Sequence, residues 1–406
     1  MKAKPHIAVI GAGCFGGWTA LQLLERGARV TLIDAWGPGN SRASSGGETR
    51  VMRGSYGANQ PYTELAARAL KLWDKYERRW KRQFLHRTGV LWMASGDDSF
   101  ELGSVEPLRS AKIKFQQLSP TQMKKRWPQI HFQGVDWAIF EPECGYLDAR
   151  ASCKAVVDAI VAAGGKYRQA AVQPDELEGE TRHGLVLSDD SKLKADLYVF
   201  ACGPWLGALF PETIGKLVEP TKQDIFFFGA APGDDRYSER NMPVWGDHRG
   251  QFWYGIPGSG RRGFKIADDT RGPAFDPTKG ERVVSPKTLE GVREYVAFRF
   301  PGLKGAPVVE TRVCQYEQTP DSHFIVDRHP RNENVWIVGG GSGHGFKHGP
   351  AIGEIMAEVL LKDRQPPAVW SLGRFQGTLV MPASQEACTP EVTEKVGLYR
   401  SSLPKP

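Results

Sequence analysis

The chain has 406 residues, of which 40% are apolar and 24% are charged. These fractions are typical of a folded globular protein and exclude disordered, collagen-like and membrane-embedded chains. A chain of this length usually forms two domains, each with its own core. The 53 basic and 46 acidic residues give a formal net charge of +7, but the basic residues come in short, separated groups. No nucleic-acid-binding module accompanies them, so we expect no nucleic-acid partner.

No stretch approaches the roughly 18 consecutive apolar residues that a membrane-spanning helix requires, and we expect no membrane partner. The 6 cysteines are scattered along the chain. They lack both the paired spacing of a zinc site and the dense spacing of a disulfide framework. We therefore expect no metal site, and we predict a cytoplasmic, monomeric protein.

The N-terminal segment predicts a strand, a tight glycine turn, a helix and a second strand. In the turn, Gly11 permits the reversal, Gly13 lets a pyrophosphate approach the backbone, and Gly16 lets the helix pack on the strand. Asp34 ends the second strand. A carboxylate there accepts hydrogen bonds from a ribose diol and repels a 2′-phosphate. The unit therefore predicts a site for FAD or NAD rather than NADP.

A polar loop is predicted from Ser41 to Arg50. Its small and hydroxyl-bearing residues allow backbone N–H groups to approach a cofactor, and Arg42, Arg50 and Arg53 add positive charge. An ordinary surface loop is the alternative interpretation.

Hydrophobic periodicity predicts further helices at residues 62–80, 151–163, 288–299 and 350–361. Short apolar runs predict strands at residues 89–93, 166–168, 170–172, 184–187, 193–199 and 335–338. The aromatic-rich segment 221–330 indicates a mostly antiparallel sheet, which we expect to form one wall of a substrate pocket.

We predict an α/β fold with a Rossmann-type dinucleotide-binding domain and a second, mostly antiparallel-sheet substrate domain. The first domain is expected to comprise residues 1–85, 148–220 and 330–380. The second is expected to comprise residues 86–147 and 221–329, and residues 381–406 are expected to form a C-terminal extension.

Five ordered motifs give the chain a family resemblance. They are Gly11-Ala12-Gly13 with Asp34, the segment 47–53, Gly263-Phe264-Lys265, Cys314-Gln315-Tyr316 before Thr319-Pro320-Asp321, and Gly343-His344-Gly345-Phe346-Lys347. Over about residues 6–362 the chain resembles the FAD-dependent amine oxidases of the monomeric sarcosine oxidase and N-methyltryptophan oxidase group, within the D-amino-acid oxidase superfamily.

The resemblance implies FAD, attached by a thioether between the sulfur of Cys314 and the C8 methyl group of the ring. Such attachment requires a thiolate, which Arg312 nearby is expected to favour. A buried, inert thiol is the alternative. The cofactor-binding residues expected from the motifs and the resemblance are Gly11, Gly13, Gly16, Asp34, Arg42, Arg50, Val172, Cys314, Gly343 and Lys347.

The resemblance also implies four catalytic residues. Lys265 is expected beside flavin N5, where its charge helps oxygen to accept electrons. Arg53 and Lys347 are expected to hold a substrate carboxylate, and Tyr254 to contact the amine or the carboxylate. In the alternative interpretation, Lys265 is a surface lysine, Arg53 and Lys347 form surface ion pairs, and Tyr254 is an aromatic residue of the core.

Two positions depart from the pattern of the sarcosine oxidases. Asp269 stands four residues after Lys265, where those enzymes have a histidine, and Ser45-Gly46 replace histidines before Gly47. Both changes are expected near the flavin or the pocket, so they put sarcosine itself in doubt as the substrate.

The predicted reaction is oxidation of a secondary amine or amino acid, such as an N-methyl amino acid. Hydride transfer to FAD gives an imine, and O2 reoxidises the flavin to yield H2O2. One alternative is a flavin-dependent dehydrogenase that uses another electron acceptor. Others are an NAD-dependent dehydrogenase, which the Asp34 fingerprint also allows, and a nucleotide-binding protein without turnover.

Overall fold

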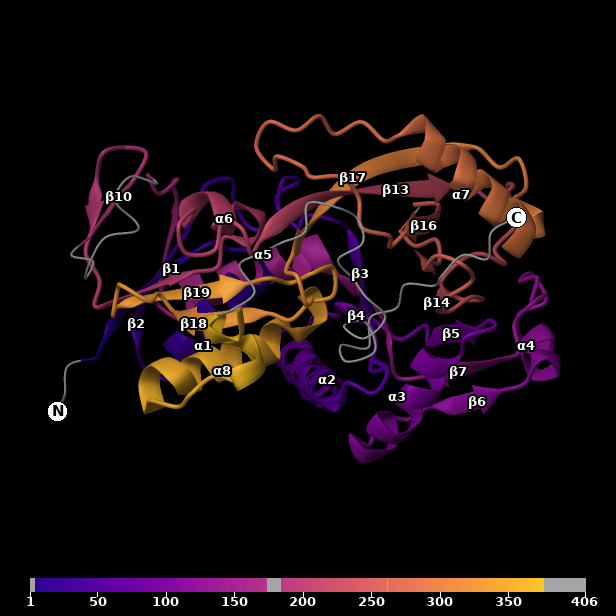
Figure 1. The fold of residues 1–406 in the computed structure, drawn as a ribbon, viewed down its shortest axis with the longest axis horizontal. Coiled ribbons are helices and arrows are strands. Elements are labelled where there is room, and N and C mark those ends of the chain that lie inside the picture. The colour runs from indigo at the N-terminus through magenta and orange to yellow at the C-terminus, as the bar shows by residue number, and fades with distance from the viewer. Residues whose placement is uncertain (1–3, 174–183, 261, 376–406) are drawn as a thin grey trace.

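The computed structural model describes residues 4–173, 184–260 and 262–375, in which two large sheets lie next to each other (Figure 1). The expected C-terminal extension, residues 381–406, lies outside the described residues. The α/β fold class with a Rossmann-type sheet and a second, mostly antiparallel sheet is confirmed. The predicted domain boundaries stay predictions.

The first sheet has six strands in the order β18-β19-β12-β1-β2-β9, and its neighbours are parallel except for the pair β18 and β19. Its strands are β1 (His6–Ile10), β2 (Arg29–Asp34), β9 (Lys166–Gln169), β12 (Leu197–Phe200), β18 (Ile325–Arg328) and β19 (Val335–Gly339). The central strand β1 is apolar almost throughout because helices cover both of its faces.

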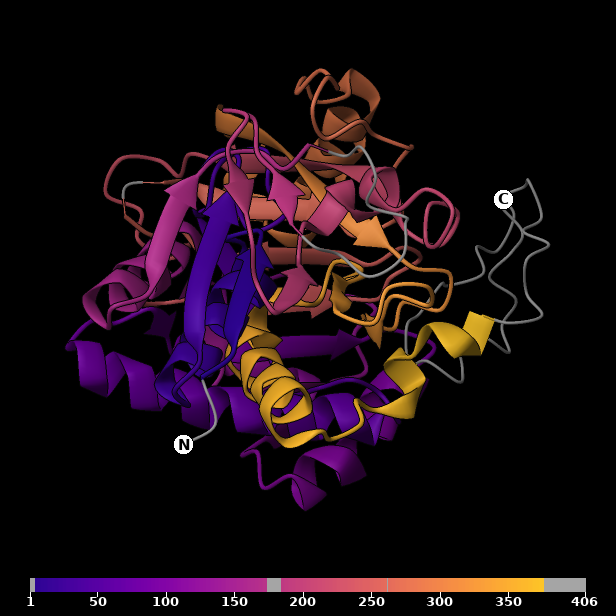
Figure 2. The same ribbon diagram turned by 90° about the vertical axis from the view of Figure 1, so that its left-hand side faces the viewer.

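Three helices cover one face of this sheet: α1 (Cys14–Glu25), α5 (Ala149–Ala162) and α8 (Gly349–Lys362). Helix α8, yellow in Figure 2, packs along α1. The other face is covered by the short helices η1 (Gly203–Trp205) and α6 (Leu206–Leu209) and by the hairpin of β10 (Leu185–Val186) and β11 (Lys192–Leu193). The parallel sheet is therefore buried between two layers.

The second sheet has eight strands in the order β17-β13-β16-β15-β14-β5-β7-β6, all antiparallel except for the pair β14 and β5. Its strands are β5 (Val90–Ala94), β6 (Gln116–Leu118), β7 (Trp137–Glu141), β13 (Glu219–Phe228), β14 (Val244–Asp247), β15 (Trp253–Ile256), β16 (Phe264–Asp268) and β17 (Val308–Gln318). Helix α7 (Pro286–Arg299) packs on one face around an aromatic core.

A small three-stranded sheet contains β3 (Thr49–Met52), β8 (Gly145–Asp148) and β4 (Leu85–His86), in the order β3-β8-β4. The remaining helices are α2 (Gln60–Trp80), α3 (Ser99–Ser110) and α4 (Pro120–Arg126). The remaining 3-10 turns are η2 (Pro301–Leu303), η3 (Phe346–His348), η4 (Ala368–Trp370) and η5 (Leu372–Phe375).

The predicted helices are confirmed to within about two residues. Three local expectations were wrong. The strand predicted over residues 193–199 is divided between β11, which ends at Leu193, and β12, which begins at Leu197. The loop predicted to reach Arg50 ends earlier, because Thr49 already pairs with Asp148 in β3. The strand predicted over residues 170–172 is a single bridge between Val172 and Leu187, because β9 ends at Gln169.

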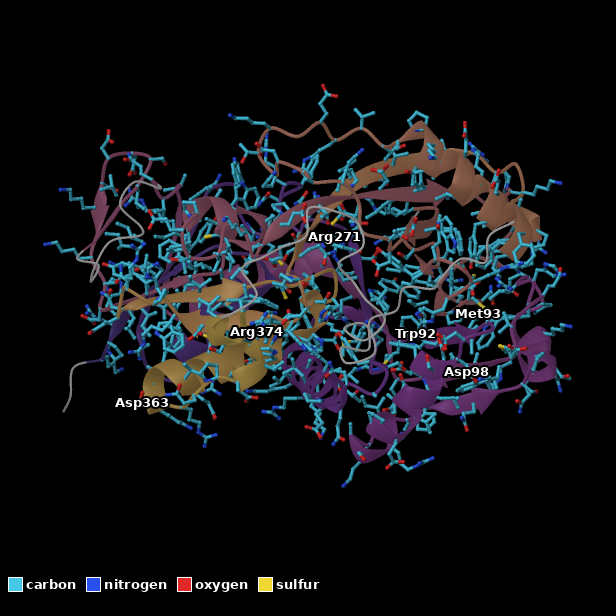
Figure 3. The ribbon with its side chains drawn as sticks, in the orientation of Figure 1. Trp92, Met93, Asp98, Arg271, Asp363 and Arg374 are labelled. Atoms are coloured by element: carbon cyan, nitrogen blue, oxygen red, sulfur yellow. The ribbon has the colours of Figure 1, made fainter. Side chains whose placement is uncertain are left out.

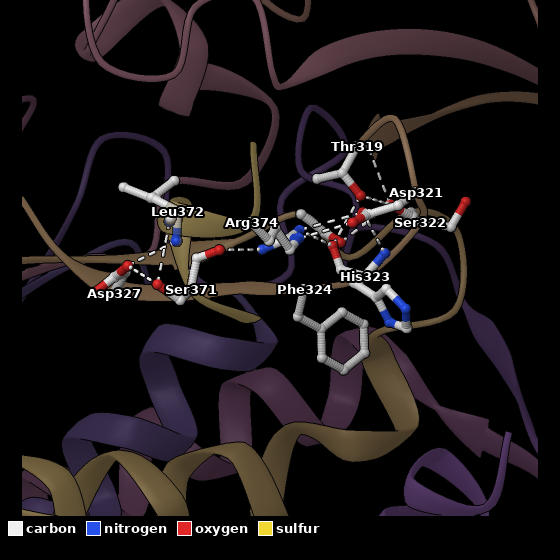
Figure 4. A network of polar contacts seen from close by, with 12 residues as sticks. Thr319, Asp321, Ser322, His323, Phe324, Asp327, Ser371, Leu372 and Arg374 are labelled. Atoms are coloured by element: carbon white, nitrogen blue, oxygen red, sulfur yellow. Dashed lines mark hydrogen bonds and ion pairs between the residues drawn. The ribbon is translucent and has the colours of Figure 1, made fainter. Parts of the chain in front are cut away.

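The last described segment is fastened to the six-stranded sheet, and to the loop that precedes β18, by hydrogen bonds from three residues (Figure 4). The Ser371 hydroxyl and the Leu372 N–H both donate to the carboxylate of Asp327 in β18, at 2.7 Å. Arg374 Nε donates to Asp321 at 2.7 Å. These bonds hold the end of the segment against the loop that contains the Thr319-Pro320-Asp321 motif.

Within the ranges that the structure describes, no helix is long and apolar enough to cross a membrane.

Candidate functional site

The glycine turn brings the start of helix α1 to the end of strand β1. Gly11 has a φ of +106°, and a Cβ on it would overlap the Ala201 carbonyl oxygen. A Cβ on Gly16 would overlap the carbonyl oxygen of Gly11, so Gly16 serves helix-to-strand packing. The turn places the start of α1 at the sheet edge, where a helix N-terminus favours an anion and where the Cys14 N–H donates to the Ser45 hydroxyl at 3.0 Å.

Asp34 lies at the end of β2, beside the same turn. Its carboxylate accepts hydrogen bonds from the backbone N–H groups of Ala12 (2.7 Å), Trp36 (2.9 Å) and Gly37 (2.7 Å). Burial raises the pKa of Asp34 from its ordinary value, although these hydrogen bonds oppose the shift. The geometry suits the acceptor of ribose hydroxyls that the sequence predicted.

A pocket that is partly open to solvent runs along this edge of the six-stranded sheet. Six of the predicted cofactor-binding residues line it: Gly11, Gly13, Asp34, Arg50, Val172 and Gly343. Gly16, Arg42, Cys314 and Lys347 are not among its lining residues. Arg42 is exposed, with its guanidinium 5.6 Å from the ring of Trp36.

Two pocket-lining side chains carry a buried polar atom without a partner among the described residues: Ser44 Oγ and Glu317 Oε2. Burial raises the pKa of Glu317 to about 7. The sequence analysis did not identify Glu317. The only sign of Glu317 in the sequence is a glutamate in strand β17, which contains both polar and apolar residues. Buried polar atoms normally have a hydrogen-bond partner, so these two atoms are positioned to bind a ligand or a water molecule in the pocket.

The eight-stranded sheet turns one face toward this edge. Lys265 on β16 is buried there, and its Nζ donates to the carbonyl oxygen (3.1 Å) and hydroxyl (3.4 Å) of Thr49. Burial, with a smaller contribution from the nearby Arg50 guanidinium, lowers the pKa of Lys265 to about 7. The lysine is therefore buried and is not the surface lysine of the alternative interpretation.

Cys314 on β17 lies on the same face, in a small apolar cluster with Ile225, Phe227 and Ala267. Arg50 Nη2 lies 3.3 Å from its sulfur. The expectation that Arg312 would assist the thiol was wrong, because Arg312 instead donates to Glu310 at 2.5 Å. The guanidinium beside the sulfur comes from Arg50 in β3.

Arg53 and Lys347 meet at one tyrosine. Lys347 Nζ donates to the Tyr56 hydroxyl (2.7 Å) and to the His344 carbonyl oxygen (2.8 Å). The Arg53 guanidinium lies 4.0 Å from the Tyr56 ring centre and 5.1 Å from that of Trp92, which Figure 3 labels on β5. Burial and Arg53 lower the pKa of Lys347 well below its ordinary value. Arg53 and Lys347 thus adjoin the same tyrosine, and neither is bonded directly to a carboxylate of the described residues.

Glu141, which sequence reasoning also missed, holds the turn that follows Arg53. Its buried carboxylate accepts from the N–H groups of Gly54 (2.6 Å) and Ser55 (3.1 Å), the Ser55 hydroxyl (2.6 Å) and Trp92 Nε1 (3.1 Å). The one signal in the sequence was a glutamate at the end of the apolar run Trp137-Ala138-Ile139-Phe140.

Tyr254 belongs to a short polar chain on the same sheet face. Its hydroxyl lies 3.5 Å from the hydroxyl of Tyr316, which donates to Asp269 Oδ1 at 2.7 Å. Tyr254 is partly buried next to the Cys314 cluster. Asp269, which stands where the sarcosine oxidases have a histidine, is therefore connected to the predicted site through these two tyrosines.

The family described as FAD dependent oxidoreductase matches residues 6–359. The chain belongs to this family. The match also decides between the two dinucleotides that the Asp34 fingerprint left open, and it rules out the NAD-dependent alternative.

Two groups of relatives in this FAD-dependent oxidoreductase family cover nearly the whole chain. Monomeric sarcosine oxidase of Bacillus sp. (strain B-0618) is 29% identical over 388 residues, which cover 92% of this chain and 97% of the relative. N-methyl-L-tryptophan oxidase of Yersinia pestis (strain Pestoides F) is 28% identical over 378 residues, which cover 91% of this chain and 99% of the relative. The resemblance that the motifs indicated is confirmed.

Solved structures share the fold. L-proline dehydrogenase from P. horikoshii superposes with a TM-score of 0.80 at 22% identity, over 93% of this chain and 99% of that one. NikD, an amino acid oxidase of nikkomycin biosynthesis, superposes with a TM-score of 0.73 at 20% identity, over 91% of this chain and 98% of that one.

The residues present fit FAD as the resident cofactor. The helix α1 N-terminus suits the pyrophosphate and Asp34 suits the ribose. The orphaned atoms of Ser44 and Glu317 lie farther along the same pocket, and a Cβ on Gly343 would come within 2.7 Å of the Tyr316 ring. Glycine at this position, with a φ of +79°, lets the backbone pack closely against the Tyr316 ring.

Proposed function

We propose that this FAD-dependent oxidoreductase oxidises a secondary amine or N-substituted amino acid that carries a carboxylate, with O2 as the electron acceptor. The observation that carries the proposal is the pairing of Arg53 and Lys347 across Tyr56, beside the sheet face that contains Lys265. The names of the sarcosine and N-methyltryptophan oxidase relatives support the same substrate class.

Arg53 and Lys347 would bind the substrate carboxylate. Neither has a carboxylate partner among the described residues, and both are held by uncharged groups. An arginine offers a planar pair of donors and a lysine offers a point charge, so the two together orient a carboxylate rather than merely attract it. Tyr254 would contact the amine or the carboxylate from the opposite sheet.

FAD, when bound, accepts a hydride equivalent from the carbon next to the amine and passes the electrons on. We propose that Cys314 forms a covalent thioether with it. Arg50 next to the sulfur provides the cationic surroundings in which nucleophilic thiolates occur in proteins. Arg50 also donates to the carbonyl oxygens of Ser44 and Thr49, which fixes the guanidinium in place.

Lys265 would supply a positive charge where oxygen is reduced. A charge held in surroundings without water stabilises a developing anion more strongly than a solvated charge does. The hydrogen bonds to Thr49 keep the ammonium directed at the junction of the two sheets. This residue favours an oxidase over a dehydrogenase that uses another acceptor.

The test is the stoichiometry of O2 consumption and H2O2 formation with N-methyl amino acids, cyclic imino acids and free amino acids. One peroxide per amine oxidised is expected. Amine oxidation that proceeds with a quinone or dye but yields no peroxide would favour the dehydrogenase. A cytoplasmic location and a monomeric state stay predictions.

A further inference from the structure

Asp269 borders the proposed site although the amine oxidase pattern has no carboxylate at this position. Residues two apart along a strand face the same side of a sheet, so Asp269 follows Lys265 and Ala267 on one face. Its N–H donates to the Phe252 carbonyl oxygen at 2.9 Å, which continues the pairing of β16 with β15. The carboxylate thus has a fixed position next to the Cys314 cluster, to which Ala267 belongs.

The surroundings of Asp269 leave one carboxylate oxygen available. Tyr316 donates to Oδ1 at 2.7 Å, and no described residue donates to Oδ2. Arg53 and Lys347 act on the carboxylate electrostatically, but both are hydrogen-bonded elsewhere, to carbonyl oxygens and to the Tyr56 hydroxyl. Burial raises the pKa of Asp269 to about 6 despite these cations, so the carboxylate is incompletely compensated.

The charges of the site therefore match those of a zwitterionic amino acid. Two cations, Arg53 and Lys347, are available to a carboxylate, and one anion, Asp269, is available to an ammonium group. Asp269 has its partly buried position without a direct ion pair among the described residues, and its second oxygen remains able to accept a hydrogen bond from a cationic ligand.

We propose that Asp269 binds the ammonium group of the substrate and accepts one of its protons. This inference rests on the proposed function, which supplies the amine. The N–H bond breaks and an O–H bond forms on the Asp269 carboxylate, while the nitrogen keeps the electron pair. No oxidant or reductant takes part. The neutral amine that results is the form able to release a hydride equivalent from its neighbouring carbon.

A purely structural Asp269, which only fixes Tyr316, predicts a different result. Loss of a structural carboxylate would weaken the binding of all carboxylate-containing ligands alike, whether or not they contain an amine. Loss of an ammonium partner affects only ligands with the amine. It even improves the binding of amine-free acids, because the repulsion between two carboxylates disappears.

The experiment compares the purified holoenzyme with its Asp269→Asn variant, using flavin absorbance to measure binding under anaerobic conditions. The probes are two isosteric pairs: sarcosine with butyrate, and proline with cyclopentanecarboxylate. Asp269→Asn is expected to weaken the binding of the amine-containing member about tenfold or more. The binding of the amine-free acid should stay the same or become tighter. Equal weakening of both members overturns the proposal.

Asp268→Asn is the matched control, because Asp268 binds Thr270 and Gln251 instead of facing the site. It should change neither pair. The wild-type holoenzyme gives an independent test should Asp269→Asn fold poorly. Between pH 7 and pH 5, protonation of Asp269 should tighten the binding of butyrate relative to that of sarcosine, whereas equal changes for both ligands contradict the proposal.

The charged and titratable groups around Asp269 are Tyr316 on β17, Tyr254 on β15, Asp268 on β16, Arg53 after β3 and Lys347 on η3. Burial raises the pKa of the two tyrosines, so they do not change charge between pH 5 and pH 7. Burial lowers the pKa of Lys347, and of Lys265 on the same face of β16, but a charge on either lysine acts on the carboxylate that both members of a pair share. Failure of the role proposed for Asp269 can be distinguished from failure of the proposed function. If the wild-type flavin is reduced by amine-containing acids but Asp269→Asn binds them normally, only the role of Asp269 is wrong. If no amine-containing acid reduces the wild-type flavin, the proposed function is wrong, and the binding pairs still report on Asp269.

Discussion

The guanidinium of Arg50 donates a hydrogen bond to the sulfur of Cys314 at 3.3 Å. The arginine belongs to the short sheet next to the dinucleotide pocket, and the cysteine belongs to the eight-stranded sheet. Arg50 also lines the pocket. This one contact therefore joins the predicted cofactor site to the sheet face that carries Lys265 and Tyr254.

The contact leads to a prediction about the cofactor link. Wild-type protein precipitated with acid should retain its yellow colour in the pellet, and the Cys314→Ser variant should release it into the supernatant. Cys202→Ser is the control, because Cys202 also lines the pocket but lies on the six-stranded side. Release of all colour from the wild-type protein would show that the flavin is not covalently bound.

Lys265→Met should slow reoxidation of the reduced flavin by O2 about 100-fold or more, and slow flavin reduction much less. The reason is the loss of a buried positive charge. Stopped-flow measurement of each half-reaction checks the prediction, with Lys222→Met on β13 as the control. A lysine whose pKa is lowered to about 7 is charged below that pH, so reoxidation should slow as pH rises through 7. Equal slowing of both half-reactions would contradict the role.

Lys347→Met should raise the dissociation constant of a carboxylate-containing substrate about 10- to 100-fold, because one charge-assisted hydrogen bond is lost. The amide of the same substrate should be affected much less. Lys362→Met, at the far end of α8, is the control. If the acid and the amide lose the same affinity, Lys347 does not bind the carboxylate.

Glu141→Gln should destabilise the fold by about 1 to 3 kcal/mol, because an amide nitrogen would face backbone donors that now bind a carboxylate oxygen. Since these donors follow Arg53, carboxylate binding should weaken as well. Urea unfolding and substrate titration measure the two effects. Glu143→Gln, at an exposed residue two positions away, should show neither.

The parts of the site that could be predicted from local patterns are those made by residues close in sequence. Gly11, Gly13 and Asp34 belong to one strand-helix-strand unit, whose periodicity and glycine spacing are visible in the sequence alone. Asp34 and the Ala12 N–H that it binds are separated by 22 positions. Chain order and hydrophobic pattern therefore suffice to place them together.

The contacts that could not be predicted join residues far apart in sequence. Arg50 and Cys314 are 264 positions apart, and the sequence suggested the neighbour Arg312 instead. Glu141 binds a turn 87 positions away, and Tyr316 binds Asp269 from another strand. Strand register decides these contacts, and register follows from the packing of both sheets rather than from any local pattern.

The most direct test of the central claim is the visible spectrum of the purified protein under anaerobic conditions, before and after addition of N-methyl amino acids, cyclic imino acids and free L- and D-amino acids. We predict a flavin band that at least one class of carboxylate-containing amine bleaches, and that returns when O2 is admitted. A flavin band that none of them bleaches would contradict the account.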